Sequence, residues 1–277
     1  MKKIENETFD EERALYGSSH VRLEHCKFDG PADGESALKE SQNIEVADSY
    51  FNLRYPFWHD DNLLIENCQM TENCRAALWY TNQVKITGSK LHGIKALREC
   101  GQVQIENTDI ISPEFGWSVD EISMKDSSAQ SEYFMMRSKK LNFQNVKLKG
   151  KYSFQYIEDS TFVDCDFDTK DSFWHANRVH IKNSTIKGEY LAWYGENLTF
   201  ENCTIIGTQP FCYCKNLKLI NCKMLEADLA FEKSQVEATV TTPMISIKNP
   251  AQGKIHVPAV EELIMDDPEA RGQVIVG

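Results

Sequence analysis

The sequence predicts an all-β protein that folds as a single-stranded right-handed parallel β-helix, and three observations support this prediction. The segment 197–205 is repeated 19 residues later as 216–224. Within each copy, apolar residues alternate with polar ones, which is the period of a β-strand. An Asn then follows two residues after the second apolar position. A repeat of this length indicates a solenoid.

The unit recurs about eleven times between residues 21 and 235, with roughly 19 residues per coil. If the first apolar residue is position zero, position two is apolar in every unit. Position four holds residues that tolerate a left-handed backbone, and it therefore predicts a bend between two short strands. Stacked bends of this kind favour a side-chain ladder, here an asparagine ladder. The residues at position four are His25, Asp48, Asn67, Gly88, Asn107, Asp126, Asn145, Asp164, Asn183, Asn202 and Asn221.

We expect a single domain with capped ends, because the repeat is continuous and the end coils of a solenoid need protection. Residues 1–20 are predicted to form an N-terminal cap, residues 21–235 the parallel β-helix, and residues 236–277 closing strands and a C-terminal cap. Residues 31–35 are interpreted as a turn insertion in the first coil.

The charge of the chain limits its partners. The formal net charge is −12, and no basic patch is visible. Such a field disfavours nucleic acid and anionic membrane surfaces, so neither is expected as a partner. No apolar run reaches the length of a membrane span, and the first residues lack the apolar stretch of a signal peptide. A cytoplasmic location is therefore expected.

The nine cysteines predict packing rather than metal binding. Position five of the repeat contains Cys26, Cys68, Cys165, Cys203 and Cys222. A recurrence every coil indicates a column of small buried residues and does not match the ligand spacing of a zinc site. We expect no metal and no cofactor.

An aromatic column is the feature most suggestive of function. All five tryptophans fall at position fourteen, which reads Trp58, Trp79, Arg98, Trp117, Met136, Gln155, Trp174, Trp193, Cys212 and Phe231. Position thirteen is apolar throughout and is expected to face inward, so the tryptophans should face outward. Position fifteen is mixed and polar, and reads His59, Tyr80, Glu99, Ser118, Arg137, Tyr156, His175, Tyr194, Tyr213 and Glu232.

Three interpretations of this face remain open. It suits a carbohydrate or similar ligand, with candidate binding residues Trp58, Trp79, Arg98, Glu99, Trp117, Trp174, Trp193, Tyr194 and Tyr213. It equally suits a homo-oligomer or another protein partner, because Trp, Tyr and Arg are common interface anchors. If the inward and outward positions are reversed, the tryptophans are instead part of the core.

Catalysis is an alternative function. Arg137, Tyr156 and His175 occupy position fifteen in three successive coils. Tyr and His as base and acid, beside an Arg that stabilises an enolate, would suit β-elimination on a uronate sugar. A simple Tyr–His hydrogen bond is the other interpretation of the same residues. Hydrolysis by paired carboxylates at Asp60 and Asp61, or at Asp109, is less favoured, because adjacent strand residues point apart and residue 109 follows a bend.

The chain resembles the pectin-lyase-like superfamily of right-handed β-helices over residues 15–250, because the asparagines at position four are similar to the asparagine ladder of those folds. More narrowly, segments 9–15, 253–258 and 264–267 resemble a bacterial family of unknown function. Some members of that family carry a hydrogenase label, which this sequence does not support because its cysteines follow the packing repeat. The polygalacturonase motif Gly-His-Gly is absent. The resemblance implies the fold, and fold alone does not imply function.

Overall fold

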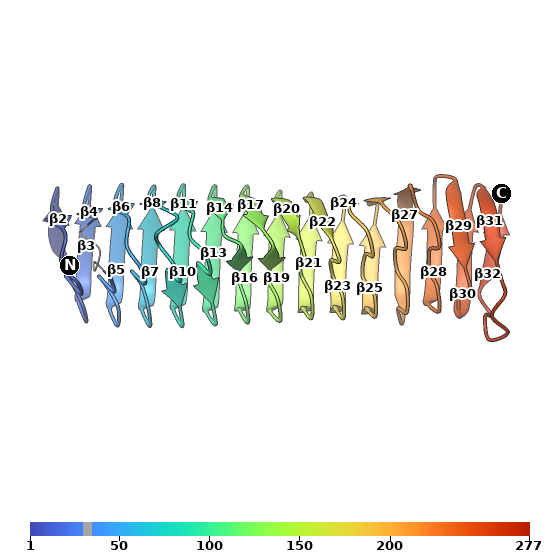
Figure 1. The fold of residues 1–277 in the computed structure, drawn as a ribbon, viewed down its shortest axis with the longest axis horizontal. Helices are drawn as coiled ribbons and strands as arrows, with labels where there is room; N and C mark the ends of the chain where they lie inside the picture. The colour runs from blue at the N-terminus through green and yellow to red at the C-terminus, as the bar shows by residue number, and fades with distance from the viewer. Residues whose placement is uncertain (30–34) are drawn as a thin grey trace. The chain divides into compact units, whose positions relative to one another are not determined.

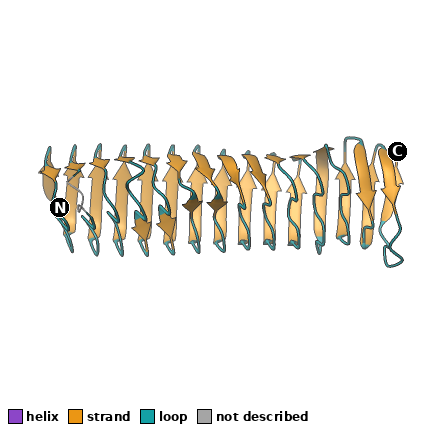
Figure 2. Cartoon of the chain, viewed as in Figure 1, coloured by secondary structure: helices purple, strands orange, loops and turns teal. Residues whose placement is uncertain are grey.

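The structure is a computed structural model that describes residues 1–29 and 35–277, so residues 31–34 of the predicted turn insertion lie outside the described part. The described residues form strands joined by turns and include no helix (Figure 2). The predicted fold class is confirmed, because the chain is an all-β parallel solenoid. It has about 14 turns of roughly 19 residues, more than the eleven expected.

The chain divides into two compact units, Met1–Lys139 and Lys140–Gly277. In the first unit, one series of strands stacks in chain order (Figure 1). It contains β1 (Lys2–Glu5), β3 (Ser19–Glu24), β5 (Gln42–Ala47), β7 (Asp61–Glu66), β10 (Asn82–Thr87), β13 (Gly101–Glu106) and β16 (Asp120–Lys125). A second series follows the bends and contains β2 (Thr8–Phe9), β4 (Lys27–Phe28), β6 (Tyr50–Phe51), β8 (Gln69–Met70), β11 (Lys90–Leu91), β14 (Asp109–Ile111) and β17 (Ser128–Ser131). Short pairs on the third side are β9 (Leu78–Trp79) with β12 (Leu97–Arg98), and β15 (Glu114–Phe115) with β18 (Tyr133–Phe134).

The second unit repeats this arrangement. Its first series contains β19 (Lys139–Gln144), β21 (Glu158–Val163), β23 (Asn177–Lys182), β25 (Glu196–Glu201), β27 (Leu217–Leu225), β28 (Gln235–Val240), β30 (Gln252–Val257) and β32 (Gln273–Val276). Its second series contains β20 (Lys147–Lys151), β22 (Asp166–Lys170), β24 (Thr185–Lys187) and β26 (Thr204–Ile206), and β29 (Met244–Lys248) pairs with β31 (Val260–Ile264).

The register of the strands explains both the repeat and the extra turns. Val179 lies beside Leu198 and Ile181 beside Phe200, so equivalent positions of successive coils form columns. The same register continues beyond the predicted repeat. At the N-terminal end, β1 pairs in parallel with β3. At the C-terminal end, β28 pairs with β30 and β30 with β32.

Stacked side chains fill the interior of each unit. In the first unit, Phe28 stacks on Phe9 at 4.8 Å and on Phe51 at 4.6 Å between ring centroids. In the second unit, Phe154 and Phe173 stack at 4.7 Å, and both are fully buried. Each buried ring contributes about 1.5–3 kcal/mol relative to exposure, so these columns account for much of the stability of each coil.

The bends lie where the sequence predicts them. Every residue at position four has a positive φ, from 48° at Asp48 to 60° at Gly88. The closest amide pairs, however, form at the start of the first-series strands, where Asn62 donates to Asn43 at 2.7 Å and Asn216 donates to Asn197 at 2.8 Å. Asn202 and Asn183, both at position four, are 3.5 Å apart.

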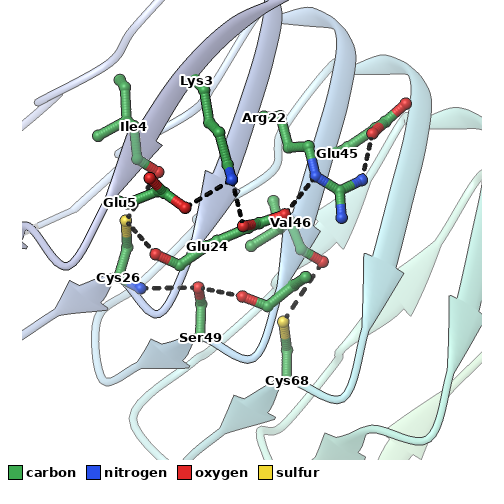
Figure 3. Close-up of polar contacts among 11 residues, drawn as sticks. Lys3, Ile4, Glu5, Arg22, Glu24, Cys26, Glu45, Val46, Ser49 and Cys68 are labelled. Atoms are coloured by element: carbon green, nitrogen blue, oxygen red, sulfur yellow. Dashed lines mark hydrogen bonds and ion pairs between the residues drawn. The ribbon is translucent and has the colours of Figure 1, made fainter.

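The first coils show how small residues and ion pairs join successive turns (Figure 3). The Cys26 amide donates to the Ser49 hydroxyl at 3.0 Å, and the Cys26 thiol donates to the Glu24 carbonyl. On the outer surface, Arg22 bridges Glu24 at 2.5 Å and Glu45 at 2.6 Å. The inner corner therefore satisfies backbone groups, while the outer surface pairs charges between neighbouring coils.

Candidate functional site

Backbone conformation places the outward residues of the third side. In the coil that carries Phe173, residues Asp171, Phe173 and His175 have φ values of 52°, 59° and 55°. The same three positions of the next coil, Tyr190, Ala192 and Tyr194, are also left-handed. Because left-handed residues alternate with others, Phe173 at position thirteen enters the core, whereas Trp174 is half-buried and His175 is exposed.

The tryptophans are half-buried, and each indole N–H is used internally. In the first unit, Trp58 donates to the Ala76 carbonyl at 2.6 Å and Trp79 to the Lys95 carbonyl at 2.7 Å. Trp117 reaches the Tyr133 carbonyl at 3.4 Å. Each bond joins one coil to the turn of the next, so these rings have a structural role.

The second unit uses the same device. Trp174 donates to the Tyr190 carbonyl at 2.7 Å, and Trp193 donates to the Gln209 carbonyl at 2.8 Å. Gln155, at the same position, donates its amide to the Asp171 carbonyl at 2.8 Å. Where position fourteen holds Trp or Gln in this unit, the side chain therefore donates an N–H to a carbonyl of the next coil.

Stacking covers the faces of the tryptophan rings. Trp58 and Trp79 stack with centroids 5.4 Å apart and planes 12° apart. Arg98 lies between Trp79 and Trp117, with its guanidinium 5.0 Å and 5.4 Å from the two ring centroids. It also contacts the Glu99 carboxylate at 3.3 Å. In the second unit, Trp174 and Trp193 stack at 5.5 Å.

The most regular exposed feature is the aromatic ladder of the second unit, which we define as Tyr156, His175, Tyr194 and Tyr213. Their ring centroids are separated by 4.8, 5.0 and 4.8 Å, with interplanar angles of 7°, 8° and 10°. The spacing matches the separation of neighbouring strands. Tyr156 is 46% exposed and Tyr194 is 44% exposed, so solvent reaches a row of ring edges.

Charged residues beside the ladder are paired with one another. Arg178 binds Asp159 at 2.5 Å and Glu158 at 2.9 Å. Two further pairs are Lys215 with Glu196 at 2.7 Å and Lys248 with Glu232 at 3.1 Å. Burial and the nearby Glu232 carboxylate raise the pKa of Tyr213. The Tyr213 hydroxyl therefore keeps its proton at neutral pH and can donate a hydrogen bond.

The first unit carries a shorter version of this surface. His59 and Tyr80 stack at 4.8 Å with planes 16° apart. Glu99 and Ser118 occupy position fifteen in the next two coils, so the run of rings ends after two. The candidate residues Trp58, Trp79, Arg98, Glu99 and Trp117 all belong to this unit, and the remaining candidates to the other.

The predicted catalytic residues do not all belong to one unit. Arg137 lies in the first unit and is exposed, with φ of 57°. Tyr156 and His175 lie in the second unit, where their rings pack face to face. The structure thus brings the two rings together as a stack, and catalysis by the trio stays a prediction.

The carboxylates considered for hydrolysis have different environments. Asp61 is exposed at the start of β7, whereas Asp60 is only 1% exposed. Asp109 accepts hydrogen bonds from the Ser128 hydroxyl at 2.8 Å and pairs with His92 at 2.8 Å. These contacts, opposed by partial burial, lower the pKa of Asp109.

The burial of Asp60 was not expected from the sequence, where this residue is considered only as a carboxylate for hydrolysis. The Ser41 amide donates to Asp60 Oδ1 at 3.0 Å, while Oδ2 is buried without a hydrogen-bond partner. Burial raises the pKa of Asp60 to about 8. The equivalent position holds Thr81 in the next coil and Ser138 in a later coil, and their hydroxyls donate to the carbonyls of Phe57 and Gly116. Ser, Thr and Cys recur at this position in the sequence, and this recurrence could have indicated that the position of Asp60 is buried.

Comparison with known proteins places the chain in a family. The family model described as "Protein of unknown function (DUF3737)" matches residues 2–276. The chain belongs to the DUF3737 family. No match is found among functionally curated proteins.

Among solved structures, this DUF3737 protein is similar to the following three, each at low sequence identity. They are the surface adhesin PfbA of Streptococcus pneumoniae (10% identity, 88% of this chain and 69% of that chain, TM-score 0.36), the A-module of the Azotobacter vinelandii mannuronan C-5 epimerase AlgE4 (7% identity, 93% and 88%, TM-score 0.32), and the plasmid-mediated fluoroquinolone resistance protein QnrB1 (8% identity, 85% and 89%, TM-score 0.20).

The cysteines of this DUF3737 chain pack in the interior. All nine are free and buried. The Cys203 and Cys222 thiols donate to the carbonyls of Ile181 and Phe200 at 3.4 Å. Burial raises the pKa of Cys68 and of Cys212 to about 12. Within the described residues, no three His, Cys, Asp or Glu side chains are grouped to hold a metal ion.

The described part of the chain also offers no helix with the length and apolar character needed to cross a membrane.

Proposed function

We propose that this DUF3737 protein binds a carbohydrate chain along the aromatic ladder of its second unit. The observation that carries the proposal is the row of four stacked rings at 4.8 to 5.0 Å intervals, of which three are exposed and Tyr213 is half-buried. A linear polymer is the ligand that a linear row of equivalent groups suits best. Each added coil supplies another contact, so modest contacts accumulate along the chain.

Hydrogen-bonding capacity supports the same ligand class. In the described part of the protein, neither the Tyr194 hydroxyl nor the Tyr213 hydroxyl has a hydrogen-bond partner. Tyrosine combines an apolar ring with a polar tip and loses little entropy when it becomes ordered, which is why it recurs at binding surfaces. Sugar hydroxyls would complete these unused bonds. We further propose, from the column of bends, that the fold belongs to the pectin-lyase-like superfamily.

The test is affinity electrophoresis through gels that contain individual soluble polysaccharides. We expect at least one polysaccharide to retard the wild-type protein, and the variant Tyr194→Ala/Tyr213→Ala to migrate freely. Tyr80→Ala, which alters the shorter stack of the first unit, serves as the matched control and should still be retarded. Equal retardation of wild type and the double variant would contradict the proposal.

Self-association through the ladder is the second candidate function. Exposed tyrosines flanked by tryptophans are also favoured at protein interfaces. Sedimentation velocity distinguishes the two functions. A dimer that the double alanine variant abolishes, together with no retardation by any polysaccharide, would favour the interface.

Two further proposals concern reaction and location. A lyase that uses Tyr156 and His175 would lose turnover in Tyr156→Phe while it retains affinity, and assays of double-bond formation in uronate polymers would detect it. Nine unpaired thiols support a reducing compartment such as the cytoplasm. Fractionation of cells that express the tagged protein tests the location.

A further inference from the structure

The aromatic ladder covers its own ring faces. His175 stacks on Tyr156 on one side and on Tyr194 on the other, with angles of 7° and 8°. Tyr194 is covered in the same way by His175 and Tyr213. Carbohydrate recognition by stacking needs an open ring face, which the inner rings of this ladder do not offer. A ligand must therefore meet the ring edges.

The tryptophans hold the ladder in this orientation. Trp193 packs at nearly a right angle against Tyr194 and against Tyr213, with interplanar angles of 79° and 77°. Its own N–H is already bonded to the Gln209 carbonyl. The Tyr194 and Tyr213 hydroxyls have no partner in the described residues and remain available for a ligand. These two hydroxyls belong to successive coils, whose rings are 4.8 Å apart.

Charge distinguishes between neutral and anionic ligands. The cations beside the ladder already have carboxylate partners, since Arg178 binds Asp159, Lys215 binds Glu196 and Lys248 binds Glu232. The whole chain carries a net charge of −12. A uronate polymer would bring a row of negative charges without a free cation to receive them, and repulsion would weaken its binding.

We infer that the ligand is an uncharged, extended polysaccharide that the ladder binds edge-on, with the Tyr194 and Tyr213 hydroxyls each hydrogen-bonded to one sugar residue. This inference rests on the proposed function of the same ladder. The rise per residue of an extended β-1,4-linked hexose chain is comparable to the strand spacing, so successive sugars meet successive coils. Discrimination comes from hydroxyl contacts and from the pairing of Arg178, Lys215 and Lys248 with carboxylates.

The experiment is isothermal titration of the full chain with cellohexaose, mannohexaose and hexagalacturonate. Tyr194→Phe/Tyr213→Phe removes two oxygens and retains the rings, so the ladder stays stacked. Tyr80→Phe is the matched control, and near-ultraviolet circular dichroism verifies that the fold of each variant is intact. We expect a neutral hexasaccharide to bind, hexagalacturonate to bind at least about tenfold more weakly, and the double Phe variant to lose about tenfold or more in affinity.

Each other outcome overturns a defined part of the reasoning. If the double Phe variant binds as well as wild type, the two hydroxyls are not the contacts. The inference of edge-on binding is then wrong, whereas the proposal of carbohydrate binding is unaffected. If hexagalacturonate binds more tightly than the neutral hexasaccharides, the charge argument is wrong and the proposed function again stands. If none of the three binds to wild type, the inference fails. The proposed function fails as well only if no polysaccharide retards the protein in gels.

Discussion

The buried carboxyl of Asp60 predicts that the protein loses stability as the pH rises through the neutral range. Asp60 Oδ1 accepts from the Ser41 amide, and Oδ2 has no partner. Burial without a cationic partner penalises the charged form. Asp60→Asn keeps the shape and the acceptor, cannot ionise, and supplies an N–H donor where the neutral acid has its O–H.

The magnitude follows from the pKa. Burial raises the pKa of Asp60 from 3.8 to about 8. Because the folded-state value lies above the unfolded value, the stabilising contribution is fully present below about pH 4 and is lost as the pH rises through about 8. Between about pH 5 and about pH 9 the wild type should lose on the order of 4 kcal/mol that the Asn variant retains.

The assay is urea unfolding of both proteins at each pH, with stability differences taken between them. Other carboxylates with lowered pKa values, such as Glu24 paired with Lys3 and Arg22, act in the opposite direction but equally in both proteins. The advantage of Asp60→Asn should therefore grow with pH. An advantage that is the same at both pH values would refute the assignment of Asp60 as a buried neutral acid.

Three further predictions concern packing. Trp193→Phe removes the N–H that bonds the Gln209 carbonyl and should lower the free energy of unfolding by about 1–3 kcal/mol in chemical unfolding. Trp174→Gln should lower it less than Trp174→Leu, because Gln155 shows that an amide can replace the indole. Equal losses for the two Trp174 variants would contradict the donor role. Arg98→Ala should lose on the order of 1–2 kcal/mol from its contacts with Trp79 and Trp117, whereas Arg98→Trp should retain most of the stability; thermal unfolding of both variants decides. A thiol-specific disulfide reagent should label none of the nine cysteines in the native protein and all of them after unfolding; rapid labelling of the native protein would show that the interior column is open.

The repeat was predictable because one physical constraint acts on every coil. A column such as Val179, Leu198 and Leu217 must be apolar wherever parallel strands stack around an interior, so the period of the sequence is the period of the fold. The ends were less predictable. Lys2 stacks beside Val21 although it is not apolar, since the outermost coil buries less surface and its sequence is less constrained.

The candidate site was predictable as a list of residues but not as a geometry. Position fourteen includes Trp, Arg and Gln among other residues, and no sequence pattern shows that the Trp and Gln side chains donate an N–H to the next coil or that Arg98 lies between two indole rings. Whether rings stack or stand apart depends on the left-handed backbone at residues such as Phe173 and His175. That conformation is unusual for aromatic residues, so the self-covered faces of the ladder could not be expected.

The central claim is that a carbohydrate lies along the ladder, and hydrogen–deuterium exchange tests it most directly. Backbone exchange is followed by mass spectrometry with and without the polysaccharide that retards the protein in gels. The account predicts slower exchange in peptides that contain Tyr194 and Tyr213, and no change in the peptide that contains His59 and Tyr80. Protection confined to the first unit, or no protection while the polysaccharide is bound, would contradict it.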